Sequence, residues 1–87
     1  MNKIWSDAAW DDYLYWQGED RKMLKKINNL IKAVEREPYT GLGKPEPLRY
    51  YDGDVWSRQI DQKNRLVYRM VEAGMEIIAC KTHYGDK

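Results

Sequence analysis

The stretch PYTGLGKPEP, residues 38–47, constrains the fold of this chain more than any other part of it. It holds three prolines and two glycines in ten residues, so it is expected to be an irregular loop. Before it, apolar side chains repeat at helical spacing, whereas after it the chain consists of short β-branched and aromatic runs. The sequence therefore predicts a helical half, a loop and a β half.

Two helices are expected before the loop. Ser6 is a suitable N-cap for a first helix that reaches about Glu19, and Asp20 is the cap of a second helix that ends before Pro38. The second helix is amphipathic, with apolar positions at Leu24, Ile27, Leu30, Ile31 and Val34 and an opposite face of Lys22, Lys25, Lys26, Asn29, Lys32 and Arg36. A solvated surface is the first interpretation of that basic face.

Four strands are expected after the loop, at residues 48–51, 55–60, 65–71 and 75–82, because turn-like segments separate these runs. Such a series predicts an antiparallel β-meander. Two helices followed by this sheet predict an α+β fold in two layers, with one sheet face partly free for binding. The run KIW at residues 3–5 is expected to add a short edge strand. A chain of 87 residues is expected to form a single domain, residues 1–87.

The composition bears on three classes of function: nucleic-acid binding, metal or cofactor binding, and membrane association. A formal net charge of +1 does not by itself indicate nucleic-acid binding, so any electrostatic attraction must be local. One histidine and one cysteine, without metal-ligand spacing, predict neither a metal site nor a cofactor, and Cys80 is expected to pack as a small apolar side chain. The longest apolar run, residues 76–80, is too short to cross a bilayer, and residues 1–10 lack a signal-peptide core. A cytosolic protein without a membrane partner is expected.

The predicted meander brings polar side chains from four segments to one edge of the sheet: Lys44 and Glu46, Arg58, Arg65, and the terminal His83 and Tyr84. Such a set offers an acid–base pair and cations that can hold a phosphate. The outer strands of a flat four-stranded sheet lie about 14 Å apart. Glu46 and His83 must therefore lean inward or act at opposite ends of an extended substrate. Taken singly, each residue is also an ordinary surface group.

Several segments of the chain together resemble a known family: IWSDAAWDDYLYWQGEDRKMLKKINNLIK, GLGKPEPLRY, WSRQIDQKNRLVY and the closing THY. Over nearly the whole chain they are similar to the YoeB/Txe toxins of the RelE/ParE superfamily. The resemblance implies a RelE-like fold and a type II toxin that cuts messenger RNA in the ribosomal decoding site. It implies Glu46, Arg65, His83 and Tyr84 as catalytic residues, with Lys44 and Arg49 as supporting cations.

The chemistry expected from this resemblance is metal-independent cleavage of RNA. Glu46 takes the proton of a ribose 2′-hydroxyl, which attacks the adjacent phosphorus. Arg65, assisted by Lys44 or Arg58, stabilises the phosphate charge, and His83 protonates the leaving 5′-oxygen. The expected products are a 2′,3′-cyclic phosphate and a 5′-hydroxyl end. Tyr84 is expected either to stack on a base or to orient the phosphate.

The resemblance also implies partners: the ribosome, messenger RNA, a YefM-like antitoxin, a second toxin copy and, through the antitoxin complex, operator DNA. Docking on ribosomal RNA becomes a second interpretation of the basic helix face. Two alternatives stay open, a non-catalytic toxin similar to ParE and a module whose open sheet face only docks a partner peptide. The chain departs from the family pattern at Gln59, where relatives often have arginine, and in the extension of residues 85–87.

Overall fold

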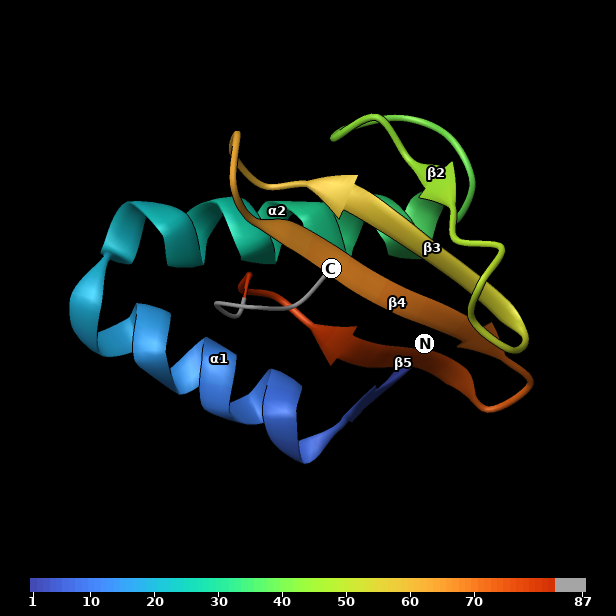
Figure 1. Ribbon diagram of the computed structural model, residues 1–87, viewed down its shortest axis with the longest axis horizontal. Helices are drawn as coiled ribbons and strands as arrows, with labels where there is room; N and C mark the ends of the chain where they lie inside the picture. Colours follow the sequence, from blue (N-terminus) through green and yellow to red (C-terminus); the bar gives the residue numbers. More distant parts are fainter. Residues whose placement is uncertain (83–87) are drawn as a thin grey trace.

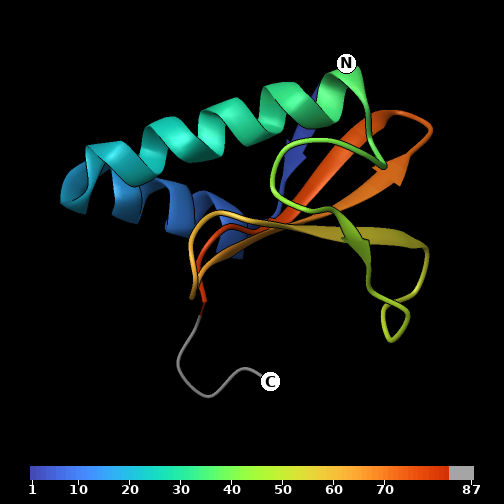
Figure 2. The ribbon, with the colours of Figure 1, turned by 90° about the horizontal axis from the view of Figure 1, so that it is seen from above.

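The computed structural model describes residues 1–82, and residues 83–87 lie outside the described part. Its elements in chain order are β1 (Asn2–Trp5), α1 (Asp7–Glu19), α2 (Arg21–Arg36), β2 (Glu46–Pro47), β3 (Asp54–Gln59), β4 (Arg65–Val71) and β5 (Gly74–Ala79). Figure 1 and Figure 2 show that the two helices form one layer and the strands form the other. The predicted α+β fold of two layers is confirmed.

The five-stranded sheet has the order β1-β5-β4-β3-β2. Strands β2 to β5 form the predicted antiparallel meander. The expected edge strand exists as β1, but it pairs with β5 in parallel, with Trp5 opposite Ile77. Parallel neighbours need a long connection, which here comprises both helices and three strands. The sheet is therefore mixed.

The first strand of the meander was predicted at the wrong place. Strand β2 consists of Glu46 and Pro47 only, whereas residues 48–51, the predicted strand, form a turn in which the Tyr51 N–H donates to the Leu48 carbonyl at 3.3 Å. The tyrosines of that stretch favour a strand by composition, but strand propensity follows packing on a half-buried surface. Strands β3 and β5 begin one residue before the predicted 55 and 75, β4 spans the predicted 65–71, and β5 ends at Ala79 rather than at residue 82.

Both predicted helix caps are confirmed. The Ala9 N–H donates to Ser6 Oγ at 3.0 Å, and the hydroxyl of Ser6 donates to the Ile78 carbonyl at 2.9 Å, which ties α1 to β5. Asp20 accepts from the Lys22 and Met23 N–H groups at the start of α2. Each cap satisfies helix N–H groups that lack an intrahelical partner, a contribution of about 1 kcal/mol. Helix α2 therefore begins directly after α1, without a linker.

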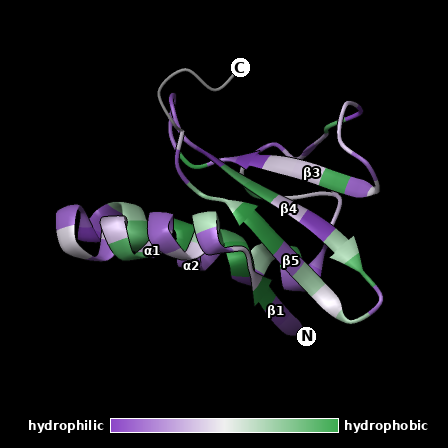
Figure 3. Ribbon diagram, turned by 60° about the horizontal axis from the view of Figure 1, so that its bottom comes forward, coloured by the Kyte–Doolittle hydropathy of each residue, from purple (hydrophilic) through white to green (hydrophobic). Residues whose placement is uncertain are grey.

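The core lies between the helices and one face of the sheet. From α2 it contains Met23, Ile27, Leu30, Ile31 and Val34, and from the sheet Leu66, Tyr68, Met75 and Ile77. Figure 3 shows hydrophobic and hydrophilic residues alternating in short bands along the helices, as expected where only one side faces a core. The prediction for the apolar face of α2 is thus confirmed, with Leu24 only partly buried.

Cys80 belongs to this core and is fully buried. Burial, together with the nearby Asp12 carboxyl, raises the pKa of its thiol to about 12, so the thiol stays protonated at neutral pH. The expectation that Cys80 is a packing residue is confirmed. Within residues 1–82, neither helix combines the length and the apolar character needed to cross a bilayer.

Candidate active site

The candidate site lies on the sheet face that is turned away from the helices. Ser57 in β3 is the register partner of Glu46 in β2 and of Val67 in β4. Direct cross-strand partners point to the same face of a sheet, and alternate residues of one strand do so too. Glu46, Ser57, Val67 and Arg65 therefore share one face, whereas Leu66 between the last two points into the core.

A hollow of about 510 Å³ opens on this face. Its floor comes from β3 and β4 and its wall from β2 and the following turn. The turn projects away from the helices, as Figure 2 shows. The lining residues are Glu46, Pro47, Leu48, Arg49, Tyr50, Tyr51, Ser57, Arg65 and Val67. The fold thus brings three of the predicted site residues, Glu46, Arg49 and Arg65, to one hollow from two segments, β2 with the turn that follows it and β4.

The charged groups of the hollow take part in no salt bridge within residues 1–82. Among residues 1–82, ion pairs involve only the terminal amino group, Lys3 and Arg69 as cations, each paired with Glu35 or Glu76. Glu46, Arg49 and Arg65 are in none of these pairs. A carboxylate beside two guanidinium groups can accept a proton and hold a phosphate at the same place.

Sequence reasoning missed Ser57 and the two tyrosines of the hollow. Ser57 is fully buried in the floor, and Arg65 Nη1 donates to its Oγ at 3.4 Å, a long and weak hydrogen bond. Tyr50 and Tyr51 stand in the wall with ring centroids 5.1 Å apart, and Tyr50 is 78% exposed. Exposed rings beside cations suit the stacking of nucleic-acid bases. The signal in the sequence for this wall is the position of Arg49, Tyr50 and Tyr51 shortly after Glu46.

Lys44 precedes the hollow but does not line it. It is exposed, and its φ of 51° makes it the one non-glycine residue with positive φ in the described chain. A left-handed conformation at such a residue costs about 1 kcal/mol or more and persists only where the surroundings impose it. The strain lies two residues before Glu46.

Arg58 requires a correction, because the structure does not place it where a phosphate could reach it. Its side chain follows Ser57 in β3 and so points to the opposite face, where it is fully buried. Its guanidinium donates to the carbonyls of Glu37, Thr40 and Leu42 and to the hydroxyl of Tyr68. Arg58 thus contacts the loop between α2 and β2, not the hollow.

His83 and Tyr84 lie outside the described residues, but the chain just before them is firmly anchored. The Cys80 N–H donates to Asp12 at 3.0 Å, and the Thr82 N–H donates to Asn64 Oδ1 at 2.9 Å. Asn64 belongs to the β3–β4 turn and directly precedes Arg65. The described chain therefore ends beside the turn that leads into β4.

The same turn is stabilised by a carboxylate. Burial of Asp61 favours its neutral form, but hydrogen bonds donated by the backbone N–H groups of Asn64 and Lys63 outweigh burial and lower the pKa of this carboxyl below its ordinary value. Asp61 is therefore charged at neutral pH and fixes Asn64, the acceptor for Thr82.

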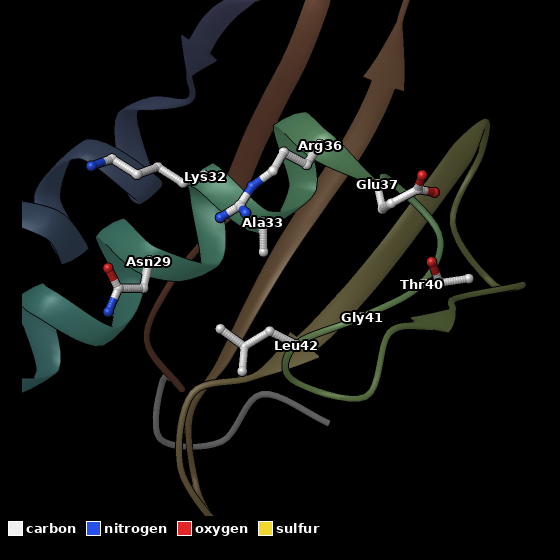
Figure 4. Close-up of a pocket in the computed structure, with 8 residues that line it drawn as sticks. All are labelled: Asn29, Lys32, Ala33, Arg36, Glu37, Thr40, Gly41 and Leu42. Atoms are coloured by element: carbon white, nitrogen blue, oxygen red, sulfur yellow. The ribbon is translucent and has the colours of Figure 1, made fainter.

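A second hollow, of about 480 Å³, lies between α2 and the loop that follows it. Figure 4 shows Asn29, Lys32 and Arg36 along α2, with Thr40 and Leu42 across from them on the loop. No carboxylate pairs with the basic residues of α2 within residues 1–82. In the same part of the chain, no three histidine, cysteine, aspartate or glutamate side chains gather in a way that would hold a metal ion.

Comparison with known proteins identifies the family. The family described as the YoeB-like toxin of bacterial type II toxin-antitoxin systems matches residues 5–84. The chain belongs to this family. Toxin YoeB of Escherichia coli strain K12 is 50% identical over 84 residues, which are 97% of this chain and 100% of that protein.

Solved structures of the YoeB family agree with the fold. The YoeB-YefM complex from Staphylococcus aureus contains a chain 40% identical to this one with a TM-score of 0.89, covering 97% of this chain and 98% of that one. A YoeB dimer from the same organism gives 41% identity and a TM-score of 0.86 over the same shares of the two chains. The resemblance found in the sequence is confirmed, and the chain is a toxin of the YoeB type.

Proposed function

We propose that this YoeB-family toxin is a ribosome-dependent endoribonuclease that cuts messenger RNA in the ribosomal A site and so stops translation in the cytoplasm. The observation that carries the proposal is the hollow shared by Glu46, Arg49 and Arg65. A carboxylate and two guanidinium groups, none of them paired within residues 1–82, can supply the general base and the charge stabilisation for phosphodiester cleavage without a metal ion.

The proposed reaction is an in-line displacement within the RNA. The Glu46 carboxylate takes the proton of the 2′-hydroxyl, whose oxygen forms a bond to the adjacent phosphorus. Arg65, with Lys44 assisting, stabilises the equatorial oxygens, and the bond from phosphorus to the 5′-oxygen breaks. His83, included because of the family resemblance, protonates that oxygen. The products are a 2′,3′-cyclic phosphate and a 5′-hydroxyl end, and DNA is not cut because it lacks the 2′-hydroxyl.

The remaining residues of the hollow suit a single-stranded substrate. Arg49 stands beside Glu46 as a further cation for the phosphate, and Tyr50 and Tyr51 offer rings on which bases stack. Tyr84, also taken from the resemblance, stacks on a base or orients the phosphate. The protein then needs no sequence-specific base contacts of its own, because the ribosome holds the message.

The basic face of α2 supports docking on ribosomal RNA. Its five cations, Lys22, Lys25, Lys26, Lys32 and Arg36, are unpaired within residues 1–82. Phosphate contacts of this kind add affinity without sequence information and weaken as salt rises. Raising the salt concentration should therefore weaken ribosome binding, and a flat salt response contradicts this part of the proposal.

Relatives indicate the other partners. The solved YoeB-YefM complex and YoeB dimer from Staphylococcus aureus support a YefM-like antitoxin and a second copy of this chain as partners. An antitoxin complex of this type would reach operator DNA through the antitoxin. Co-expression with such an antitoxin should abolish cleavage, and a toxin that cuts equally well in its presence argues against this partner.

The decisive experiment maps cut ends on a message held by programmed ribosomes. Glu46→Gln removes the base without changing size, so the cleavage rate should fall by about 10²–10⁴-fold. Glu72→Gln, in the exposed β4–β5 turn, is the control and should cut at the wild-type rate. Equal rates for wild type and Glu46→Gln contradict the assignment. Uncut message together with inhibited gyrase supercoiling supports the ParE-like alternative instead.

A further inference from the structure

Arg58 is a fully buried cation that makes no ion pair within residues 1–82. Burying a charge is unfavourable unless hydrogen bonds replace its water. Here Nη1 donates to the Leu42 carbonyl and Nη2 to the Thr40 carbonyl, both at 2.9 Å, and Nη2 also donates to Glu37, the C-cap of α2. The C-terminal end of a helix carries partial negative charge, which favours a cation at this place.

These contacts hold one segment, residues 37–43, which we name the anchor loop. Nε of Arg58 donates to the Tyr68 hydroxyl at 3.1 Å, and that hydroxyl donates to the Pro38 carbonyl at 2.6 Å. The residue after Arg58 continues the attachment, because the Gln59 N–H donates to the Gly43 carbonyl at 2.7 Å. The anchor loop is thus fixed along its length to β3 and β4. Its side chains Thr40 and Leu42 form the loop wall seen in Figure 4.

Glu46 depends on this loop because its own strand is too short to position it. Strand β2 has two residues, and Pro47 has no N–H to donate. A slip of one residue in the pairing with β3 would turn Glu46 to the other face of the sheet. The register must therefore be supported from outside β2: downstream by one bond from the Leu48 N–H to the Val55 carbonyl at 2.9 Å, and upstream by the anchor loop.

Packing at Gly43 shows how closely the loop approaches its anchor. A Cβ atom at this position would lie 3.0 Å from Arg58 Cβ and 2.8 Å from Leu30 Cδ2, and its φ is +85°. The loop backbone thus approaches Arg58 so closely that a side chain at position 43 does not fit. Lys44, the strained residue that follows, then directs the chain to Glu46.

We propose that Arg58 is a positioning residue for the cleavage reaction. Acting from the helix-facing side of β3, it fixes the anchor loop so that the Glu46 carboxylate stands in the hollow on the opposite side, next to Ser57. The inference rests on the proposed function, and it replaces substrate binding as the role of Arg58. A positioning residue acts on the catalysed step, whereas a cation that contacts RNA also acts on binding.

The test compares Arg58→Gln with wild type at saturating ribosome concentration. A displaced Glu46 should lower kcat by about tenfold to a hundredfold, while the ribosome concentration at half-saturation stays within about twofold. Hydrogen exchange should become faster at the amides of Leu48 and Gln59, which bond to Val55 and Gly43 in the folded protein. Arg58→Lys keeps the charge but lacks the guanidinium fork, so it should resemble Arg58→Gln.

A core variant separates positioning from general destabilisation. Ile77 is fully buried in β5; it is the register partner of Tyr68, but its apolar side chain makes no hydrogen bond to the anchor loop. Of Ile77→Val and Ile77→Ala, the one that unfolds closer to the temperature of Arg58→Gln serves as the matched control, and it should keep the wild-type kcat. Tyr68→Phe removes only the hydroxyl that links Arg58 to Pro38. It should lower kcat in the same direction, and it replaces Arg58→Gln if that variant does not fold.

Three outcomes overturn the inference. They are a wild-type kcat in a folded Arg58→Gln, an equal loss of kcat in the stability-matched Ile77 variant, and an altered half-saturation with kcat preserved. If wild type itself cuts no message, the proposed function fails. Hydrogen exchange then still tests whether Arg58 fixes the anchor loop. Faster exchange at Leu48 and Gln59 in Arg58→Gln supports the anchor, and unchanged exchange refutes it.

Discussion

Ser57 and Arg58 are neighbours in β3, and both are fully buried, yet they lie in two different environments. Arg58 is enclosed by α2, the anchor loop and Tyr68. Ser57 lies under a hollow whose lining includes three charged residues and two tyrosines. The helix-facing side of the sheet is filled by protein, whereas the opposite side carries a hollow whose charged residues form no salt bridge within residues 1–82. Burial alone therefore does not separate structural from functional residues in this fold.

If this comparison is correct, truncation on the helix-facing side should reduce stability most. Ile27→Ala should lower the free energy of unfolding by about 2–5 kcal/mol, because it leaves a cavity in a closed core. Val67→Ala, on the partly filled side, should lower it by only about 1 kcal/mol because Val67 is already partly exposed. Urea unfolding of both variants measures the difference. Equal losses would show that the two sides are packed alike.

The sequence predicted the elements whose two sides differ in polarity. Short stretches of sequence were enough to predict the two helix caps, Ser6 and Asp20, and the apolar face of α2. The limits of β4 were predicted in the same way. The buried environment of Arg58 was not predicted from the sequence, because residues on both sides of β3 are buried. Val55 and Ser57 on one side and Arg58 on the other give no alternation between apolar and polar residues. A strand of this kind does not reveal from its own sequence which side carries the core.

The candidate site was predicted to a similar extent. Glu46 and Arg65 were placed at one edge from strand order, and the structure brings both to one hollow. The turn after β2 was missed because tyrosines are common in strands. Arg49, which belongs to this turn, was therefore predicted to lie in a strand. His83 and Tyr84 stay predictions, supported by the anchoring of Thr82 to Asn64.

A glycine-to-alanine substitution in the anchor loop tests how tightly the helix-facing side of the sheet is packed. Gly43 and Gly53 both have left-handed φ angles, +85° and +88°, so alanine is strained at either position. At Gly43 the new Cβ meets Leu30 and Arg58 in the interior, whereas at Gly53 it meets only the flexible side chain of Arg69. Gly43→Ala should therefore lower the free energy of unfolding by about 1–3 kcal/mol more than Gly53→Ala. Similar thermal stabilities would mean that the anchor loop yields easily.

Cys80 tests how completely the helix-facing side excludes water. The pKa of its thiol in the folded protein is about 12, above the ordinary value of 9.0, so folding disfavours the thiolate. The resulting stability is fully present below pH 9.0 and is lost as the pH rises toward 12. Between these values wild type should lose up to about 1.4 kcal/mol per pH unit more than Cys80→Ala, measured by urea unfolding. Parallel pH profiles would indicate that the thiol ionises without unfolding.

The smallest expected effect separates the two sides most directly, because it compares two serine-to-alanine substitutions. Ser6→Ala removes the α1 cap and should lower the free energy of unfolding by about 1 kcal/mol, without changing the cleavage rate. Ser57→Ala removes the acceptor for Arg65 and should lower the cleavage rate by about two- to tenfold, since the hydrogen bond is long. Single-turnover cleavage and thermal unfolding of both variants give the four values needed. If Ser57→Ala changes only stability, Arg65 does not rely on the floor of the hollow, and the open side of β3 is structural after all.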